Sequence, residues 1–322
     1  MTIEPDGLAL SVIIPVYRET EALAQIHARF EKCVGEHESY EIIYVNDGNV
    51  NNEVYHAMEA MRGLKNTRII HLSRNFGQHI AIAAGLKNSK GKYVLVMDAD
   101  LQYLPEDAYR MYRWAVEKGR SVVISVLKQR VHSLGKRMAS KLFYWLMRHL
   151  GAPQRSDIGS MFLVSRHVAR GILRINDRYR LTIPMIYWLG GDISYFEVSH
   201  QARKSGRSGY NFVSSLRLLL NGITSFSAKP LYLSFVLSMF FALATGGIMV
   251  NLLYNRIFRG EVFLSGWLST LLVILISATL ILVCLGVVGL YVGRMFETIN
   301  RRPLYFVQEQ NSEAILFEDE ET

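Results

Sequence analysis

Two carboxylates, Asp98 and Asp100, stand at the end of a short apolar run that begins at Tyr93. The run is rich in Val, which predicts a buried strand, and residues two apart on an extended chain point to the same side. Two carboxylates on one side supply half of an oxygen site for a hard divalent cation and leave room for phosphate oxygens and water. An Asp-X-Asp triplet by itself is weak, because a chain of this length contains about one by chance. The position of the pair at the end of a strand favours a ligand-binding role, because open α/β sheets bind ligands at the carboxyl ends of their strands.

Strand and helix patterns alternate around this pair along the first part of the chain. Strands are predicted over 11–17, 40–45, 67–72, 93–97 and 121–127, and helices over 21–34, 52–64, 78–88 and 105–118. This alternation predicts an α/β domain with a mostly parallel sheet and helices on both faces. Polar or turn-forming residues end the first four strands and should converge at one edge of the sheet: Pro15 and Tyr17, Asn46-Asp47-Gly48, Ser73-Arg74-Asn75, and Asp98-Ala99-Asp100.

Asp47 follows an apolar strand and precedes Gly48. Its carboxylate could accept hydrogen bonds from a base or a ribose, or it could simply form a turn. Gly48 belongs to no G-x-G-x-x-G run and the chain has no G-x-x-x-x-G-K-[ST] motif, so neither a dinucleotide site nor a P-loop is supported. A sugar nucleotide fits better, with a metal on its diphosphate held by two Asp.

The C-terminal part of the chain is strongly apolar. The 322 residues are 50% hydrophobic, with a mean hydropathy of +0.14, and two uncharged stretches at 231–253 and 268–292 account for much of this. Stretches of about 23 and about 25 residues are long enough to span a bilayer, although two buried core helices are the alternative. A short connection between them predicts a hairpin with both chain ends on one side. The distribution of Lys and Arg favours cytoplasmic ends, and the N-terminus does not resemble a signal peptide.

These patterns predict three parts: a cytoplasmic domain over 1–228, a transmembrane hairpin over 229–293 and a cytoplasmic tail over 294–322. Apolar residues at helical spacing within 211–230 fit an interfacial helix lying on the membrane, although a short amphipathic core helix would look the same.

A basic segment lies between the two halves of the first domain, just before the apolar and aromatic run at 142–147. A solvated charged face is the ordinary explanation of such a segment, but the aromatic neighbours suit a membrane interface. Basic residues near a membrane suit phosphate groups, and the family resemblance given below implies that these residues hold the lipid phosphate and the donor diphosphate: Lys128, Arg130, Lys136, Arg137 and Lys141. The net charge of +8 would also allow nucleic acid as a partner, but no nucleic-acid module is recognisable and membrane proximity explains the charge more simply.

Several of these motifs together carry a resemblance to a known family. They are the segment 11–17 with Glu19, Asn46-Asp47-Gly48, the run 74–79 leading into Ala84-Gly85, and Asp98-Ala99-Asp100-Leu101-Gln102 with Pro105-Glu106. The chain resembles the family 2 glycosyltransferases with the GT-A fold, a Rossmann-like domain with a mostly parallel sheet. Over residues 10–306 it is most similar to the polyprenyl-phosphate glycosyltransferases, the group that contains dolichol-phosphate mannose synthase and the bacterial undecaprenyl-phosphate glucose and aminoarabinose transferases.

The resemblance implies inverting transfer of one sugar from a nucleotide sugar, UDP-linked, to undecaprenyl phosphate. The product would be a lipid-linked sugar for cell-envelope glycan such as O-antigen or lipid A. It also implies a multi-pass protein of the inner, cytoplasmic membrane, with a homo-oligomer up to a tetramer. Asp98, Asp100 and Gln102 would bind Mg²⁺ or Mn²⁺. The nucleotide sugar would be bound by Pro15, Tyr17, Glu19, Asp47, Asp98 and Gln102.

The same resemblance assigns the acceptor side. Asp157 would lie beside the transferred sugar and acceptor phosphate as a catalytic carboxylate, with Asp100 and Arg130, although an Asp that ends a turn is the alternative. The acceptor phosphate would be bound by Arg137, Lys141, Arg203 and Ser208. The chain departs from the family at Asn46, where an Asp is usual, and at Gly209, where a basic residue is usual.

Two other functions fit part of the sequence. A processive polysaccharide synthase would carry a Gln-X-X-Arg-Trp signature, and the nearest match, at Arg113-Trp114, lacks the Gln. A non-catalytic membrane subunit that binds sugar nucleotides would need no intact acidic residues. Metal-dependent transfer of a sugar into lipid distinguishes these possibilities.

Overall fold

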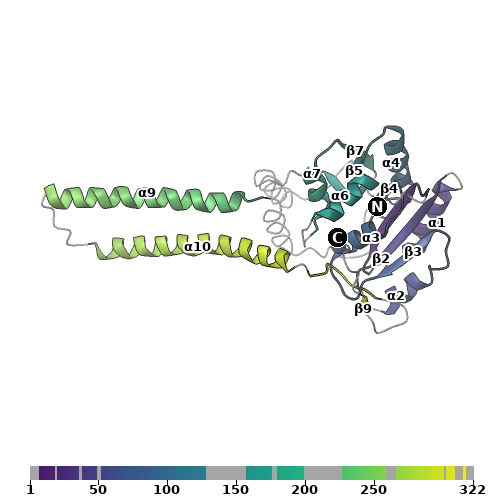
Figure 1. Ribbon diagram of the computed structural model, residues 1–322, viewed down its shortest axis with the longest axis horizontal. Coiled ribbons are helices and arrows are strands. Elements are labelled where there is room, and N and C mark those ends of the chain that lie inside the picture. Colours follow the sequence, from purple (N-terminus) through teal and green to yellow (C-terminus); the bar gives the residue numbers. More distant parts are fainter. Residues whose placement is uncertain are drawn as a thin grey trace. The chain divides into compact units, whose positions relative to one another are not determined.

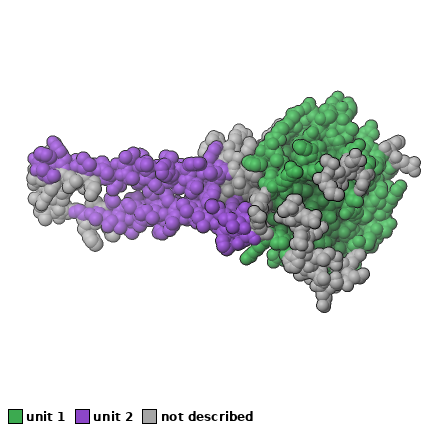
Figure 2. All heavy atoms as spheres, in the orientation of Figure 1, with its two compact units in different colours: residues 1–222, 302–322 green, residues 223–301 purple. Residues whose placement is uncertain are grey.

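The computed structural model describes residues 7–18, 20–35, 38–48, 52–127, 157–175, 180–198, 227–258, 266–300, 302–308 and 315–316. The chain forms two compact units, which Figure 2 shows in green and purple. Unit 1 contains residues 1–222 and 302–322, and unit 2 contains residues 223–301.

Unit 1 is built on a seven-stranded sheet in the order β3-β2-β1-β4-β6-β5-β7 (Figure 1). The strands are β1 (Leu10–Val16), β2 (Tyr40–Asn46), β3 (Thr67–His71), β4 (Tyr93–Val96), β5 (Val122–Leu127), β6 (Ile158–Ser165) and β7 (Ile193–Val198). Only β6 among them runs against its neighbours, because it pairs antiparallel with both β4 and β5. The predicted mostly parallel sheet is therefore confirmed, and the carboxyl ends of the other six strands meet at the edge where β6 begins.

Helices cover both faces of this sheet, as the alternating pattern predicts. They are α1 (Leu23–Val34), α2 (Asn52–Glu59), α3 (Gln78–Asn88), α4 (Pro105–Glu117), α6 (Arg166–Arg174) and α7 (Thr182–Leu189). Alternate residues of β1 join α1 and α4 in one apolar core, while Ile13 faces α3 on the other side. All seven residues of β1 are buried, which is why this strand reads as an apolar run without alternation.

The helix predicted over 52–64 is too long. α2 ends at Glu59, and the chain then makes successive tight turns in which Met61, Arg62 and Leu64 each bond to the carbonyl three residues earlier. The bonding changes from the α-helical to the tighter 3₁₀ pattern before the chain enters β3. The strand β7 and the helices α6 and α7 were not predicted.

Unit 2 consists of two long helices, α9 (Lys229–Phe258) and α10 (Trp267–Ile299), which contact each other. The Tyr291 hydroxyl donates a 2.6 Å hydrogen bond to the Ser227 carbonyl, so the two ends of the hairpin are tied together. The windows Lys229–Ile248 and Val273–Ile299 are long and apolar enough to cross a membrane, and no described residue in either is buried. These helices therefore do not form the core of a soluble domain.

The segment after α10 belongs to unit 1. The Phe306 carbonyl accepts a 2.9 Å hydrogen bond from the Ser73 amide, and Val307 forms a β-bridge with Leu72, just beyond β3. Val307 begins the short strand β8 (Val307–Gln308), which pairs with β9 (Ile315–Leu316). A C-terminal strand thus lies at the end of the sheet where β3 terminates.

Candidate active site

The structure gathers most of the described candidate residues along the carboxyl edge of the sheet. Asn46 ends β2 and pairs with Val16 of β1, while Asp98 and Asp100 follow β4. Asp157 reaches the same edge from the opposite direction, because β6 is antiparallel and begins one residue later. The Asp157 carbonyl accepts a 3.0 Å hydrogen bond from the amide of Leu127, the last residue of β5.

Asp98 is half-buried, and both of its carboxylate oxygens accept hydrogen bonds. Gln78, the first residue of α3, donates from Nε2 to Oδ1 at 2.6 Å. Ser160 of β6 donates from its hydroxyl to Oδ2 at 2.5 Å. Helix α3 and strand β6 thus fix the direction in which this carboxylate points.

Asp100 begins a tight turn. Its Oδ1 accepts a 3.1 Å hydrogen bond from the Gln102 amide, and the residue between them, Leu101, has a φ of 57°. An Asp that bonds the amide two residues later stabilises such a turn, and the left-handed φ is uncommon for Leu. The turn keeps the half-buried Asp100 and Gln102 at the edge of the sheet.

The donor set at this turn suits a hard cation. Asp98, Asp100 and Gln102 offer only oxygen ligands, which Mg²⁺ and Mn²⁺ prefer. Within the described residues, no group of three His, Cys, Asp or Glu side chains could hold a metal ion. The remaining ligands would therefore come from phosphate oxygens and water, which fits a metal that binds together with a nucleoside diphosphate.

Asp47 is buried, and its carboxylate stabilises the loop that leads into α3. Oδ1 accepts hydrogen bonds from the amides of Phe76 at 2.9 Å and Gly77 at 3.0 Å. Burial raises the pKa of Asp47, and the two amide hydrogen bonds oppose that rise. The carboxylate thus has a local role in folding, and its contact with a nucleoside stays a prediction.

The model of the family described as Glycosyl transferase family 2 matches residues 11–173, a range that contains β2 to β6, β1 except for Leu10, and this whole acidic edge. The chain belongs to glycosyl transferase family 2. It is 31% identical to the uncharacterized glycosyltransferase YkcC of Bacillus subtilis (strain 168), over 92% of this chain and 93% of that protein. It is 32% identical to the undecaprenyl-phosphate 4-deoxy-4-formamido-L-arabinose transferase of Proteus mirabilis (strain HI4320), over 93% of each chain.

The predicted family is therefore confirmed, and the protein is a glycosyltransferase with a GT-A-like sheet. Among solved structures, glucosyl-3-phosphoglycerate synthase from Mycobacterium tuberculosis in complex with uridine diphosphate has a TM-score of 0.48 and 15% identity. The match covers 68% of this chain and 80% of that chain. A likeness this faint carries no argument about the site.

Sequence reasoning missed a chain of hydrogen bonds behind the acidic edge of the glycosyltransferase. Asn46 Nδ2 lies 3.1 Å from His71 Nδ1, and His71 Nε2 lies 2.9 Å from a Glu59 carboxylate oxygen. An amide nitrogen can only donate, so His71 accepts at Nδ1 and donates at Nε2 as a neutral imidazole. Burial lowers the pKa of His71, in keeping with that neutral form. The only sequence signal was the departure at Asn46, and an Asp there would place a charge against His71.

The residues predicted to bind the nucleoside are described in part. Pro15 is buried within β1, and Tyr17, which follows that strand, is 39% exposed with the Arg18 guanidinium 5.2 Å from its ring centre. The remaining predicted site residues lie outside the described residues, and their roles stay predictions: Glu19, Lys128, Arg130, Lys136, Arg137, Lys141, Arg203 and Ser208.

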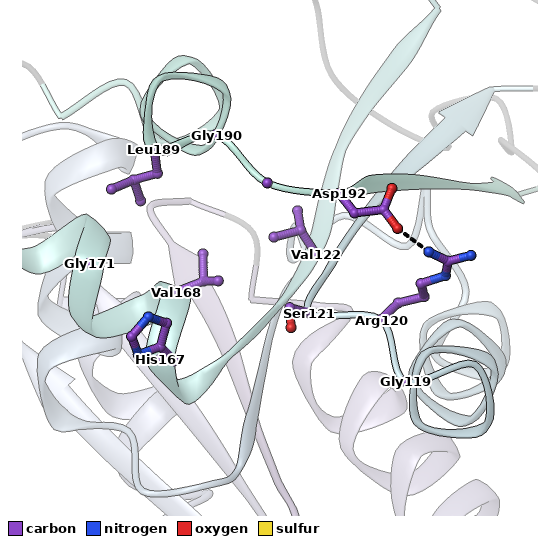
Figure 3. Close-up of a pocket in the computed structure, with 11 residues that line it drawn as sticks. Gly119, Arg120, Ser121, Val122, His167, Val168, Gly171, Leu189, Gly190 and Asp192 are labelled. Carbon is purple, nitrogen blue, oxygen red and sulfur yellow. Dashed lines mark hydrogen bonds and ion pairs between the residues drawn. The ribbon is translucent and has the colours of Figure 1, made fainter.

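A cavity of about 360 Å³ lies elsewhere in the glycosyltransferase, at the opposite edge of the sheet (Figure 3). Residues preceding β5 and β7, together with α6, form its walls. Its single carboxylate, Asp192, is paired with Arg120, and its other charged or titratable group is His167. Because this cavity lacks a pair of carboxylates for a cation, the chemistry favours the carboxyl edge as the metal–diphosphate site.

Proposed function

We propose that the protein transfers one sugar from a nucleotide sugar, UDP-linked, to the phosphate of undecaprenyl phosphate, with inversion at the sugar carbon. The observation that carries this proposal is the oriented Asp98 and Asp100 pair at the carboxyl edge of a family 2 sheet. The two apolar helices α9 and α10 support a lipid acceptor, because they are long enough to hold the chain in a membrane. The relatives named as undecaprenyl-phosphate transferases, at about 30% identity over almost the whole chain, support the same acceptor.

Asp98, Asp100 and Gln102 would hold Mg²⁺ or Mn²⁺, which when bound neutralises the charge that develops on the departing nucleoside diphosphate. The chain itself must then orient two anionic substrates. The Asp98 carboxylate, whose direction is fixed by two hydrogen bonds, would face the donor. Asp157, at the start of β6, would face the acceptor. The acceptor phosphate is already an anion and needs little deprotonation, so positioning and charge screening matter more than a strong base.

The location follows from the same proposal. The hairpin α9–α10 would lie in the inner, cytoplasmic membrane, with the catalytic unit and both chain ends on the cytoplasmic side. The basic residues Arg130, Arg137, Lys141 and Arg203, with Ser208, would bind the acceptor phosphate near the bilayer surface. The lipid-linked product would serve as a sugar donor for cell-envelope glycan, and the protein would act as a homo-oligomer up to a tetramer.

A panel of labelled nucleotide sugars incubated with detergent-purified protein, undecaprenyl phosphate and Mn²⁺ tests the proposal. The expected result is a butanol-extractable product from a UDP-sugar that carries a single sugar and is lost when the metal is chelated. Hydrolysis of the nucleotide sugar without any lipid product would contradict it. A ladder of longer products would indicate a processive synthase, and binding without turnover would indicate a non-catalytic subunit.

A further inference from the structure

The Asp98 carboxylate is held from two elements that lie far from it in the sequence. Gln78 donates from Nε2 to Oδ1 at 2.6 Å and Ser160 donates from Oγ to Oδ2 at 2.5 Å, and both donors are exposed side chains. Hydrogen bonds to an ionised carboxylate are about twice as strong as neutral ones. A carboxylate oxygen has two lone pairs and can accept a hydrogen bond while it binds a cation, so these bonds are compatible with a role of Asp98 as a metal ligand.

Ser160 also holds the far end of the same loop. Its backbone amide donates a 3.0 Å hydrogen bond to the hydroxyl of Tyr103, a buried residue five positions after Asp98. Ser160 therefore bonds to both ends of the 98–103 loop, once through its side chain and once through its backbone. The loop and β6 form a closed ring of covalent and hydrogen bonds.

The neighbouring residue shows that this contact is close. At Gly159 a Cβ atom would collide with the Tyr103 hydroxyl and with the Ser125 hydroxyl. The absence of a side chain at Gly159 thus allows β6 and β5 to approach the Tyr103 ring. Gly159 lies two residues after Asp157. Strand β6 begins next to Asp157, the carboxylate predicted on the acceptor side. The same strand therefore also fixes the 98–103 loop, which is predicted to bind the donor.

We propose that Ser160 and Gln78 are positioning residues that orient Asp98 for binding the metal–diphosphate group, and that Ser160 couples the 98–103 loop to the strand carrying Asp157. This inference rests on the proposed function, because it assigns Asp98 to the cation. Neither residue needs to touch the substrate. Loss of a hydrogen-bond partner behind a metal ligand typically costs about 10- to 100-fold in metal affinity or activity.

The test measures Mn²⁺ affinity in the presence of UDP, by electron paramagnetic resonance of the free ion, on the full-length protein in detergent. Ser160→Ala and Gln78→Ala should each weaken Mn²⁺ binding by about 10-fold or more. Ser160→Thr keeps a hydroxyl and should restore most of the affinity. Ser165→Ala is the matched control, because Ser165 lies on the same strand at the opposite edge and its side chain makes no capping hydrogen bond.

Steady-state kinetics and thermal unfolding separate positioning from folding. Ser160→Ala should lower kcat and leave the KM for the lipid acceptor nearly unchanged, with an unfolding midpoint like that of Ser165→Ala. Wild-type Mn²⁺ affinity in both Ser160→Ala and Gln78→Ala would overturn the inference, and so would a loss in Ser160→Ala that Ser160→Thr does not restore.

Asp98→Asn distinguishes the inference from the function on which it rests. If Asp98→Asn abolishes Mn²⁺ binding with UDP while the Ser160 and Gln78 variants bind normally, the inference fails and the proposed function stands. If Asp98→Asn itself binds Mn²⁺ normally, the assigned role of Asp98 fails, and the positioning role fails with it.

Discussion

The polar residues behind the acidic edge are held in defined states by their neighbours. Asp47 is buried as a carboxylate with two amide donors, and His71 is buried as a neutral imidazole between Asn46 and Glu59. Burying a polar group costs free energy unless its hydrogen bonds are replaced, and here they are. The ends of β2 and β3 are therefore ordered before any ligand binds.

His71 predicts how the free energy of unfolding depends on pH. Burial lowers its pKa, although Glu59 opposes the shift, so the folded state disfavours the proton that an unfolded His binds below about pH 6.5. His71 therefore contributes to the free energy of unfolding above about pH 6.5, and this contribution is lost as the pH falls below that value. Arg62 and then His71 hold the pKa of Glu59 at about 2, so Glu59 stays ionised throughout that range.

The unfolding midpoint of the wild-type protein should therefore fall between pH 7.5 and pH 5.5, as followed by thermal unfolding in detergent. His71→Gln keeps a neutral, hydrogen-bonding side chain and should show a smaller fall over the same interval. Burial also lowers the pKa values of His27 and His79, so these two residues should contribute to the fall that remains. An identical fall in both proteins would show that His71 does not contribute.

Among the elements, helix α3 is the one on which sequence and structure agree best, because its predicted bounds are the observed ones. Its residues from Ile80 to Leu86 are all buried, and Gly85 lies against the Ile13 side chain of β1. The absence of a side chain at Gly85 lets the helix approach the sheet. This approach places Gln78, at the start of α3, beside Asp98.

Gly85→Ala should destabilise the protein, although Ala normally favours a helix over Gly by about 1 kcal/mol. The new Cβ would collide with Ile13, and overpacking of this kind costs about 1–3 kcal/mol. Gly63→Ala is the control, because nothing lies within 4 Å of the Cβ it would add. The unfolding midpoint should fall for Gly85→Ala and stay close to wild type for Gly63→Ala; equal midpoints would contradict the close packing.

The sequence predicts elements better than it predicts which distant elements meet. The acidic pair was visible because Asp98 and Asp100 follow an apolar strand directly. The bonds from Gln78 and Ser160 to Asp98 join residues 20 and 62 positions apart, so no local pattern could reveal them. Strand β7 was missed because most of its residues are only half-buried, which weakens the apolar signal.

At the scale of the whole molecule, the two helices of unit 2 expose large apolar side chains along their length. On α9 and α10 large side chains such as Leu243, Ile281 and Phe296 are more than 60% exposed. Contiguous apolar surface beyond a few hundred Å² marks an interaction site, and here its length matches a bilayer. The hairpin prediction depended on the length and lack of charge of two stretches, which is why it could be made from the sequence.

The full-length protein should remain in the membrane pellet after an alkaline carbonate wash and be released by detergent. Carbonate removes proteins held at the surface by charge, whereas two spanning helices resist it. Release of the protein by carbonate alone would contradict the transmembrane hairpin and leave only surface attachment.

The acidic carboxyl edge, and not the cavity at the opposite edge of the sheet, is the proposed active site. The most direct test is the Mn²⁺-dependent transfer of labelled sugar into butanol-extractable lipid by Asp98→Asn and by the cavity variant His167→Ala. Loss of charge stabilisation worth several kcal/mol predicts a fall of about 100-fold or more for Asp98→Asn. His167→Ala should transfer sugar at the wild-type rate. Wild-type transfer by Asp98→Asn, or its loss in His167→Ala alone, would contradict this assignment.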